Sequence, residues 1–547
     1  MKTWLPQIVG PRFQNCANRL GFPDEGVRPT WTIRLRLGWN SEGGRYRGRS
    51  SSFCAIQERK GVKTVRKRRV AILSALWAAI LVAVSGATYS QANAASAEKP
   101  NILFIFADDQ CFETIAAFGH TDIETPNLDR LAKSGAVFTH AYNMGSWTGA
   151  VCVASRTMFN TGRFLWRAHE LDQTKALQAE AAAGRLWSQM LADVGYETYM
   201  TGKWHVKIDP PQIFDHVVHV RPGMPRTVPE AYQRPIEGKP DPWRPWDRSL
   251  GGFWEGGRDW GEVLAEAATV YLRNAAGVPR PFFMYLAFNA SHDPRQSPKE
   301  FVDKYPPERI KVPKNFLPEY PYMEEMAAGK KLRDERLAPW PRTEYAIKVH
   351  RGEYYALITH MDVQIGKILD ALEATGKAKN TYIFFTADHG LAVGHHGLMG
   401  KQNMFEHSLR PPLIVVGPDV PAGKRIDTPV YIQDIMATSL ELAGARNTDH
   451  VEFKSLMPVI RGEKKSLHDV IYGAYLDKQR AVIKDGWKLI YYPAVPKYLL
   501  FNLNDDPDEM NDLSEKPEFA AKLAELKKLL AEQEAKLGGP LAGKIAP

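Results

Sequence analysis

The chain has 547 residues, of which 44% are hydrophobic and 24% are charged. This balance is typical of a globular protein with a large buried core and excludes a disordered chain. The formal net charge of +9 would suit a nucleic-acid partner, but residues 1–97 hold sixteen Lys/Arg against four Asp/Glu. The rest of the chain has 55 basic and 58 acidic side chains, so we expect no nucleic acid among its partners.

A candidate export signal occupies residues 62–97. Four consecutive basic residues (66–69) precede an apolar run of seventeen residues (70–86), and small residues follow at 92–97. This order is typical of a cleaved signal peptide, with a mature N-terminus between Ala95 and Glu98. The alternative is a retained membrane anchor, for which the apolar run is slightly short. We therefore expect an exported protein, periplasmic or extracellular, without a stable membrane partner.

Residues 1–61 precede this signal and contain many arginines. Because a signal peptide belongs at the start of the translated chain, we expect that Met1 is not the true start and that Val62 or Val65 is. Of the four cysteines, two lie in this upstream extension, which leaves Cys111 and Cys152. Two cysteines do not make a disulfide framework.

Four continuous apolar runs predict strands that are buried on both faces of a mostly parallel sheet. They cover residues 101–106, 282–288, 382–385 and 413–416. Helical spacing of apolar residues at 354–372 adds a helix between two of these strands, and this alternation indicates an α/β fold. Residues 209–260 are rich in Pro, Trp and Gly without a period, so we expect long loops there.

The C-terminal part has a different pattern. Short strand-like pieces are followed by one amphipathic helix; they cover residues 481–483, 488–492, 499–501 and 519–537. We expect a small α+β domain over residues 471–547, after a main domain over residues 98–470.

Acidic residues follow two of the predicted buried strands. Asp108 and Asp109 come directly after the strand at 101–106, and Asp388 and His389 come after the strand at 382–385. Ligands in open α/β sheets bind beyond the carboxyl ends of the strands, and adjacent carboxylates repel each other unless a cation lies between them. We therefore expect these four residues to hold one divalent cation. Carboxylates favour Ca²⁺ or Mg²⁺, whereas the imidazole also suits Mn²⁺ or Zn²⁺; Ca²⁺ is our choice.

The segment from Cys152 to Arg163 carries the most specific motif of the chain. It reads Cys-Val-Ala-Ser-Arg and ends, after four more residues, in Thr-Gly-Arg. This pattern resembles the sulfatase family, in which the cysteine is oxidised to formylglycine by a formylglycine-generating enzyme. Ala154 stands where proline is commoner in the family. Similar blocks extend over nearly the whole chain after residue 100.

The resemblance implies an alkaline-phosphatase-like α/β fold and hydrolysis of a sulfate monoester. Hydrated formylglycine at Cys152 has two hydroxyls: one, activated by the metal, attacks sulfur, and the other then loses its proton and expels sulfate. Arg156, four residues later, would pair with the negative charge around this nucleophile.

Further residues of the site come from the same resemblance. In the Gly-Lys-Trp-His block, Lys203 would bind sulfate oxygens and His205 would handle the proton of the hydrate; an extended chain there would point both to one side. His292 would protonate or bind the leaving oxygen, and Lys401 is similar to a second sulfate-binding lysine near that oxygen. Glu406 matches a structural position.

The sequence leaves the substrate and two alternative functions open. A phosphonate or phosphodiester hydrolase would use the same formylglycine apparatus, and an inactive carbohydrate-binding relative would have lost part of it. Sulfated carbohydrates, choline sulfate and aryl sulfates are all candidate substrates. Four tryptophans in the loop-rich segment favour a sugar, because indole faces stack on sugar rings, or they pack the loops onto the body: Trp243, Trp246, Trp254 and Trp260.

Overall fold

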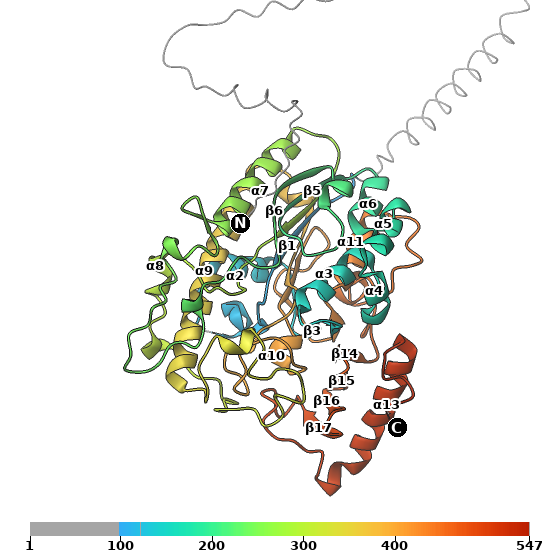
Figure 1. Cartoon of the computed structure of the whole chain (residues 1–547). Coiled ribbons are helices and arrows are strands. Elements are labelled where there is room, and N and C mark those ends of the chain that lie inside the picture. Colours follow the sequence, from blue (N-terminus) through green and yellow to red (C-terminus); the bar gives the residue numbers. More distant parts are fainter. Residues whose placement is uncertain (1–97, 121, 546–547) are drawn as a thin grey trace, which may run out of the picture. The chain divides into compact units, whose positions relative to one another are not determined.

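An eight-stranded sheet forms the centre of the protein (Figure 1). The structure is a computed structural model that describes residues 98–120 and 122–545. The strand order is β12-β2-β11-β10-β1-β9-β5-β6. In chain order these strands are β1 (Asn101–Ala107), β2 (Ala136–Phe138), β5 (Glu197–Lys203), β6 (His216–Arg221), β9 (Phe282–Ala287), β10 (Thr381–Ala387), β11 (Leu413–Val416) and β12 (Lys424–Ile426).

The middle of the sheet is parallel, as predicted. Strands β10, β1, β9, β5 and β6 run in one direction, and every residue of β1, β9 and β10 is buried. Strand β11 pairs antiparallel with β10, which differs from the expectation for residues 413–416. The connection 388–412 contains no long crossover helix. The chain therefore starts β11 at the edge where β10 ended and must run back beside it.

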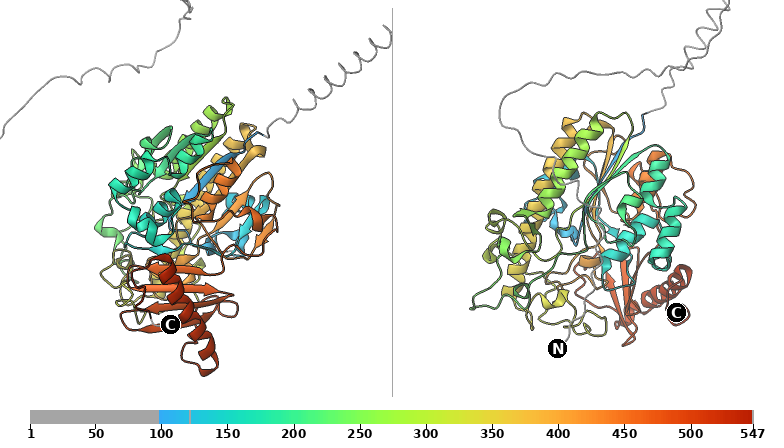
Figure 2. Two further views of the ribbon diagram at one scale, coloured as in Figure 1. Left: turned by 90° about the vertical axis from the view of Figure 1, so that its right-hand side faces the viewer. Right: turned by 45° about the horizontal axis from the view of Figure 1, so that its top comes forward.

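Helices cover both faces of the sheet (Figures 1 and 2). Leu103 and Ile105 of β1 pack with one group of helices, and Phe104 and Phe106 pack with the other, because successive side chains of a strand point to opposite faces. The first group is α2 (Pro126–Ser134), α7 (Trp260–Ala276) and α9 (Glu344–Ala374). The second group includes α3 (Val151–Thr161), α5 (Thr174–Ala182), α6 (Trp187–Asp193) and α11 (Asp434–Ala443). The shorter helices are α4 (Leu165–Leu171), α8 (Lys299–Val302), α10 (Glu406–Leu409) and α12 (Met457–Ile460).

Helix α9 starts ten residues earlier than the predicted helix at 354–372. The Thr343 side chain accepts a hydrogen bond from the Ala346 amide and caps the helix. Its first turns bury polar residues, including His350 and Arg351. Hydrogen bonds and ion pairs allow these polar residues to be buried. Because the buried residues are polar, the first turns lack the apolar period from which the full helix could have been predicted.

The segment 209–260 is mostly loop, as expected, but it also contains the edge strand β6. Most of β6 is solvent-exposed, and its sequence therefore lacks the apolar run by which the other strands were predicted. The remaining elements of this segment are short: η3 (Pro210–Gln212), η4 (Pro229–Ala231), β7 (Trp254–Glu255), η5 (Arg248–Leu250) and β8 (Arg258–Asp259).

The C-terminal region has the predicted α+β structure. Its sheet has the order β17-β16-β15-β14-β4, and helix α13 packs on it. The elements are β14 (Ile471–Tyr475), β15 (Gln479–Lys484), β16 (Trp487–Tyr492), β17 (Lys497–Asn502) and α13 (Ala520–Leu537), joined by β4 (Gly145–Ser146). Strands β3 (Ala141–Tyr142) and β13 (Val430–Tyr431) form a separate two-stranded sheet. Because β4 pairs with β14 just before Cys152, this sheet is joined to the region of the active site, and the domain boundary after residue 470 stays a prediction.

Two predictions concern residues outside those that the structure describes. These are the upstream extension at 1–61 and the signal peptide at 62–97. Among the helices of residues 98–545 that the structure describes, none is long and apolar enough to cross a membrane.

Candidate active site

Two neighbouring strands end at the site. Ala107 of β1 is opposite Ala387 of β10 in the parallel register, so Asp108 and Asp388 leave the sheet side by side. Both carboxylates are fully buried. The Asp109 amide donates a hydrogen bond to Asp388 Oδ1 over 3.2 Å, which ties the two strand ends together.

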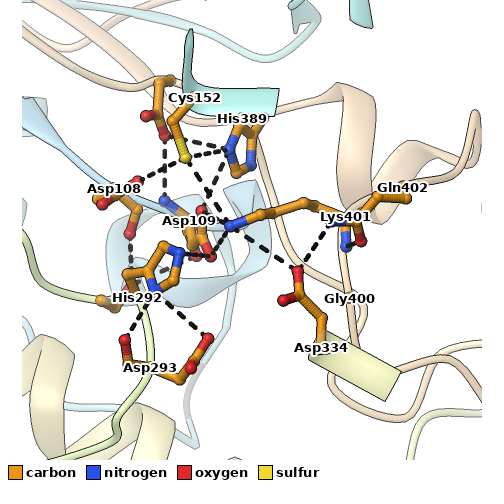
Figure 3. A network of polar contacts seen from close by, with 12 residues as sticks. Asp108, Asp109, Cys152, His292, Asp293, Asp334, His389, Gly400, Lys401 and Gln402 are labelled. Carbon is orange, nitrogen blue, oxygen red and sulfur yellow. Dashed lines mark hydrogen bonds and ion pairs between the residues drawn. The ribbon is translucent and has the colours of Figure 1, made fainter. Parts of the chain in front are cut away.

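Asp109 and His389 complete the group of predicted metal ligands. The backbone of Asp109 has a φ of 58°, in the left-handed region that few non-glycine residues adopt. The chain turns there, and the carboxylates of Asp108 and Asp109 both face the site although the residues are adjacent (Figure 3). His389 Nε2 lies 3.1 Å from Asp109 Oδ1, and His389 Nδ1 lies 2.9 Å from the Gly390 carbonyl oxygen. That contact orients the ring.

Cys152 lies in the first turn of α3 and faces these ligands (Figure 3). Its Sγ is 3.5 Å from Asp108 Oδ1 and 3.5 Å from His389 Nε2. Cys152 and Cys111 are both buried and free. The amide groups at the start of a helix favour an anion, and the position of Cys152 in α3 therefore suits an anionic group bound there.

The site fits a divalent cation. Ligand atoms of five buried residues lie within 4.8 Å of one another: Asp108, Asp109, Cys152, Asp388 and His389. Burial, together with the charge of Asp388, raises the pKa of Asp108 well above its usual range. A cation would relieve this repulsion between carboxylates, and three carboxylates with one imidazole are a donor set that hard divalent ions accept.

Two buried lysines contact the carboxylates directly. Lys203 Nζ forms an ion pair with Asp108, and Lys401 Nζ lies 2.9 and 2.7 Å from the two Asp109 oxygens and 3.8 Å from Cys152 Sγ. The family resemblance predicts that these lysines bind sulfate. In the structure they neutralise buried carboxylates. Burial alone would raise the pKa of the Cys152 thiol, but the charges of Lys203 and Lys401 outweigh burial and hold that pKa well below its usual range.

Arg156 lies one helical turn after Cys152 and is fully buried. Its Nε donates to Asp388 Oδ2 over 3.0 Å, and its Nη1 donates to the Lys203 carbonyl over 3.0 Å. Its guanidinium also lies 4.5 Å from the centre of the Phe106 ring. Arg156 thus joins α3 to the ends of two strands of the sheet.

The two predicted acid–base histidines contact different members of this centre. His292 Nε2 is 3.8 Å from Asp109 Oδ2, and burial lowers the pKa of His292 to about 4. A hydrogen bond from His205 contributes to the lowered pKa of Cys152, which makes His205 a neighbour of the thiol. The expected extended chain is wrong at this point, because β5 ends at Lys203 and His205 has a φ of 63°.

The structure brings all ten predicted site residues together and adds three that the sequence did not reveal. Asp293 Oδ1 lies 3.3 Å from His292 Nδ1, and Asp334 Oδ2 lies 3.9 Å from Lys401 Nζ. Arg333 forms ion pairs with both of these aspartates. Asp293 follows a recognised histidine, but residues 333 and 334 belong to a segment without strand or helix period, and nothing in the sequence marks them.

Comparison with known proteins decides the family. The sequence model of the sulfatase family matches residues 100–445, and a model for the C-terminal part of N-sulphoglucosamine sulphohydrolase matches residues 394–536. The chain belongs to the sulfatase family. It is a sulfuric ester hydrolase, which confirms the enzyme class inferred from the sequence.

Relatives of this sulfatase include carbohydrate-active enzymes. An N-acetylglucosamine-6-O-sulfatase of Bacteroides thetaiotaomicron is 26% identical over 83% of this chain and 89% of its own. A solved enzyme in complex with its substrate D-glucosamine-2-N,6-O-disulfate has a TM-score of 0.63 at 23% identity, covering 80% of this chain and 98% of its own. The phosphonate monoester hydrolase of Agrobacterium radiobacter has a TM-score of 0.62 at 19% identity, with 80% and 96% covered. These two structures support the predicted alkaline-phosphatase-like fold.

Proposed function

We propose that this sulfatase removes sulfate from a sulfated carbohydrate with formylglycine formed from Cys152. The observation that carries the proposal is the position of Cys152 Sγ, which contacts Asp108, His389 and Lys401 at once. The only other cysteine among the described residues is Cys111, and it belongs to no such group. Burial also raises the pKa of Cys111. A nucleophile at residue 152 would therefore stand at a cation site and beside a buried ammonium.

Asp108, Asp109, Asp388 and His389 would hold the cation. Ca²⁺ is our preference because oxygen ligands dominate the set, and Mg²⁺ or Mn²⁺ are the alternatives because His389 supplies nitrogen. The ion would supply positive charge that activates the nucleophile and offsets the charge of the sulfate group.

The chain's own residues account for the rest of the proposed chemistry. Lys203 and Lys401 are buried cations near residue 152, and each has an ammonium with three donors that would also bind sulfate oxygens. His205 would take the proton from the group at residue 152. His292 would hold the leaving oxygen with Nε2, while the Asp293 carbonyl oxygen, 2.7 Å from Nδ1, holds the other nitrogen of the ring.

Formylglycine supplies a nucleophilic hydroxyl together with a route for the release of sulfate. We propose that a formylglycine-generating enzyme reads the segment from Cys152 to Arg156 before folding, because Cys152 is only 2% exposed in the folded protein. We therefore expect this maturation enzyme to act during synthesis. Because Ala154 stands where proline is commoner in the family, it is the residue of the segment that tests recognition by the enzyme.

A carbohydrate is the proposed substrate class because the relative from Bacteroides thetaiotaomicron, which is 26% identical, is an N-acetylglucosamine-6-O-sulfatase. Choline and aryl sulfates are alternative substrates. The phosphonate hydrolase neighbour supports the fold only, since its identity is 19%. An inactive relative is disfavoured because every predicted catalytic and metal-ligating side chain is present at one site.

Comparative hydrolysis tests this proposal. The protein is produced with a formylglycine-generating enzyme, and product release is measured from sulfated monosaccharides, 4-nitrophenyl sulfate and a phenyl phosphonate monoester. We expect kcat/KM for the sulfate esters to exceed that for the phosphonate by at least about tenfold, and Cys152→Ala to reduce turnover by about 10³-fold or more. A preference for the phosphonate would contradict the proposal.

We propose further that the enzyme is exported. Removal of the signal peptide would leave a mature N-terminus between Ala95 and Glu98. The support is the order of basic, apolar and small residues over 62–97. N-terminal sequencing of protein from the native host tests this. Peptides from residues 1–61 would show that Met1 is the true start, and retention of residues 70–86 would show a membrane anchor instead.

A further inference from the structure

Arg333 lies beside the active site and outside the predicted catalytic set. Its side chain is 30% exposed, whereas those of its partners Asp293 and Asp334 are each 5% exposed. Arg333 Nη2 donates to Asp293 Oδ1 over 3.1 Å, and its two Nη atoms form further ion pairs with Asp293 and Asp334. Arg333 is therefore the member of this group whose side chain solvent reaches most.

Asp293 and Asp334 connect Arg333 to two residues of the active site, His292 and Lys401. Asp293 contacts the ring of His292 over 3.3 Å. Asp334 lies 3.9 Å from Lys401 Nζ, and it accepts a hydrogen bond from Gln402 over 2.9 Å. Because His292 and Lys401 are the two residues proposed at the leaving oxygen, Arg333 spans the side on which the leaving group must lie.

The charge balance around Arg333 indicates what it would bind. One guanidinium faces two carboxylates, so the group has a net charge of −1 and does not attract a second anion. Arginine has five N–H donors, and within the described residues its Nε makes no hydrogen bond. A partly exposed arginine with an unused donor, in a group of negative net charge, suits an uncharged acceptor, such as the hydroxyl or ring oxygen of a sugar.

We infer that Arg333 is a specificity residue that binds a hydroxyl group of a sugar leaving group, while Asp293 and Asp334 hold the guanidinium in place. This inference rests on the proposed sulfatase activity and narrows its substrate class to uncharged hydroxylated rings. It also gives a role to Arg333, whose segment contributes no strand to the central sheet and no helix that covers it.

A substrate comparison tests the inference. Arg333→Gln and Arg333→Lys are assayed on 4-nitrophenyl sulfate and on monosulfates of glucose, galactose and N-acetylglucosamine, using the full chain with verified formylglycine. A charged hydrogen bond is worth enough that Arg333→Gln should lower kcat/KM for the best sugar sulfate about 10- to 100-fold. Activity on the aryl sulfate, whose ring has no hydroxyls, should fall about tenfold less. Arg333→Lys, which keeps the charge, should lie between the wild type and Arg333→Gln.

Arg336→Gln is the matched control, because Arg336 is exposed on the same short turn and stacks on Tyr232 instead of contacting the aspartates. It should leave the ratio of the two activities unchanged. Equal losses on both substrates in Arg333→Gln would overturn the inference and show that Arg333 acts only through His292 or Lys401. The absence of any loss would overturn it as well. If Arg333→Gln does not fold in thermal unfolding, Arg333→Lys decides by the same ratio.

The outcome for the wild type separates this inference from the proposed function. Turnover of 4-nitrophenyl sulfate without turnover of any sugar sulfate would overturn the inference and leave the sulfatase activity standing. Turnover of neither class by protein with verified formylglycine and bound metal would instead overturn the proposed function.

Discussion

Arg156 Nε lies 3.0 Å from Asp388 Oδ2, and both side chains are completely buried. The contact joins the helix of Cys152 to the end of β10. Although burial alone would raise the pKa of Asp388, the charges of His389 and Arg156 outweigh it and hold that pKa well below its usual range. One guanidinium thus links the helix of the proposed nucleophile to a proposed metal ligand.

Arg156→Lys should be severe for this reason. Lysine keeps the charge but does not reach Asp388 and the Lys203 carbonyl together, because it lacks the planar fork of arginine. Leaving Asp388 partly unpaired should reduce the free energy of unfolding by about 3 kcal/mol. Thermal unfolding and kcat should both fall. A variant with the thermal stability and turnover of the wild type would show that the contact is unimportant.

Metal binding should depend on carboxylates from both strand ends. Asp109→Asn and Asp388→Asn should each weaken metal affinity and lower turnover by about 10²-fold or more. Metal content by elemental analysis and the rise of the melting temperature with added Ca²⁺ measure binding without relying on activity. Asp122→Asn, a surface carboxylate paired with Lys311, is the control. Full activity in verified metal-free protein would refute the metal site.

Lys401 should control the ionisation of residue 152 before maturation. In unmodified, metal-free protein, Lys401→Met removes a positive charge beside the thiol, so the pKa of Cys152 should rise. The thiolate absorbance near 240 nm, recorded against pH and compared with the wild type, measures the change. Cys111 should not interfere, since burial raises its pKa. Superimposable titration curves would contradict the contact seen here.

Asp362 should make stability depend on pH. Its carboxylate accepts hydrogen bonds from the amides of Asn127 and Leu128 at the start of α2, and burial raises its pKa to about 6. Since the folded-state pKa lies above the unfolded value, this group's stabilisation is complete below about pH 4 and is lost as pH rises through about 6.

Asp362→Asn removes that titration. The stability of the wild type relative to the variant should therefore fall by about 1 kcal/mol between about pH 5 and about pH 7.5. Melting temperatures of both proteins at several pH values give the comparison. Curves that stay parallel across this range would mean that the pKa of Asp362 is not raised.

The sequence predicted the sheet and the place where the proposed metal ligands gather, because both depend on local patterns. An uninterrupted apolar run marks a strand buried on two faces, and the residues after it, such as Asp108 and Asp388, must lie at the carboxyl edge. The direction of β11 was not predictable from its run of four apolar residues. That direction depends on the path of the preceding loop, which has no period.

The parts of the site that the sequence did not predict depend on contacts between segments that are distant in the chain. Arg333 reaches Asp293 across 40 residues, and no spacing rule joins them. Likewise, the pairing of Lys203 with Asp108 follows from burial of two strand ends in three dimensions. Lys203 itself was found by resemblance, but its carboxylate partner was not.

In the proposed mechanism, formylglycine at residue 152 carries the reaction. The most direct measurement is the molar fraction of aldehyde in the peptide that contains residue 152, determined by mass spectrometry alongside the rate of sulfate release for the same preparations. Preparations matured to different extents should show turnover proportional to the aldehyde fraction, with none in Cys152→Ala. Full turnover by protein whose residue 152 is an unmodified thiol would contradict the account.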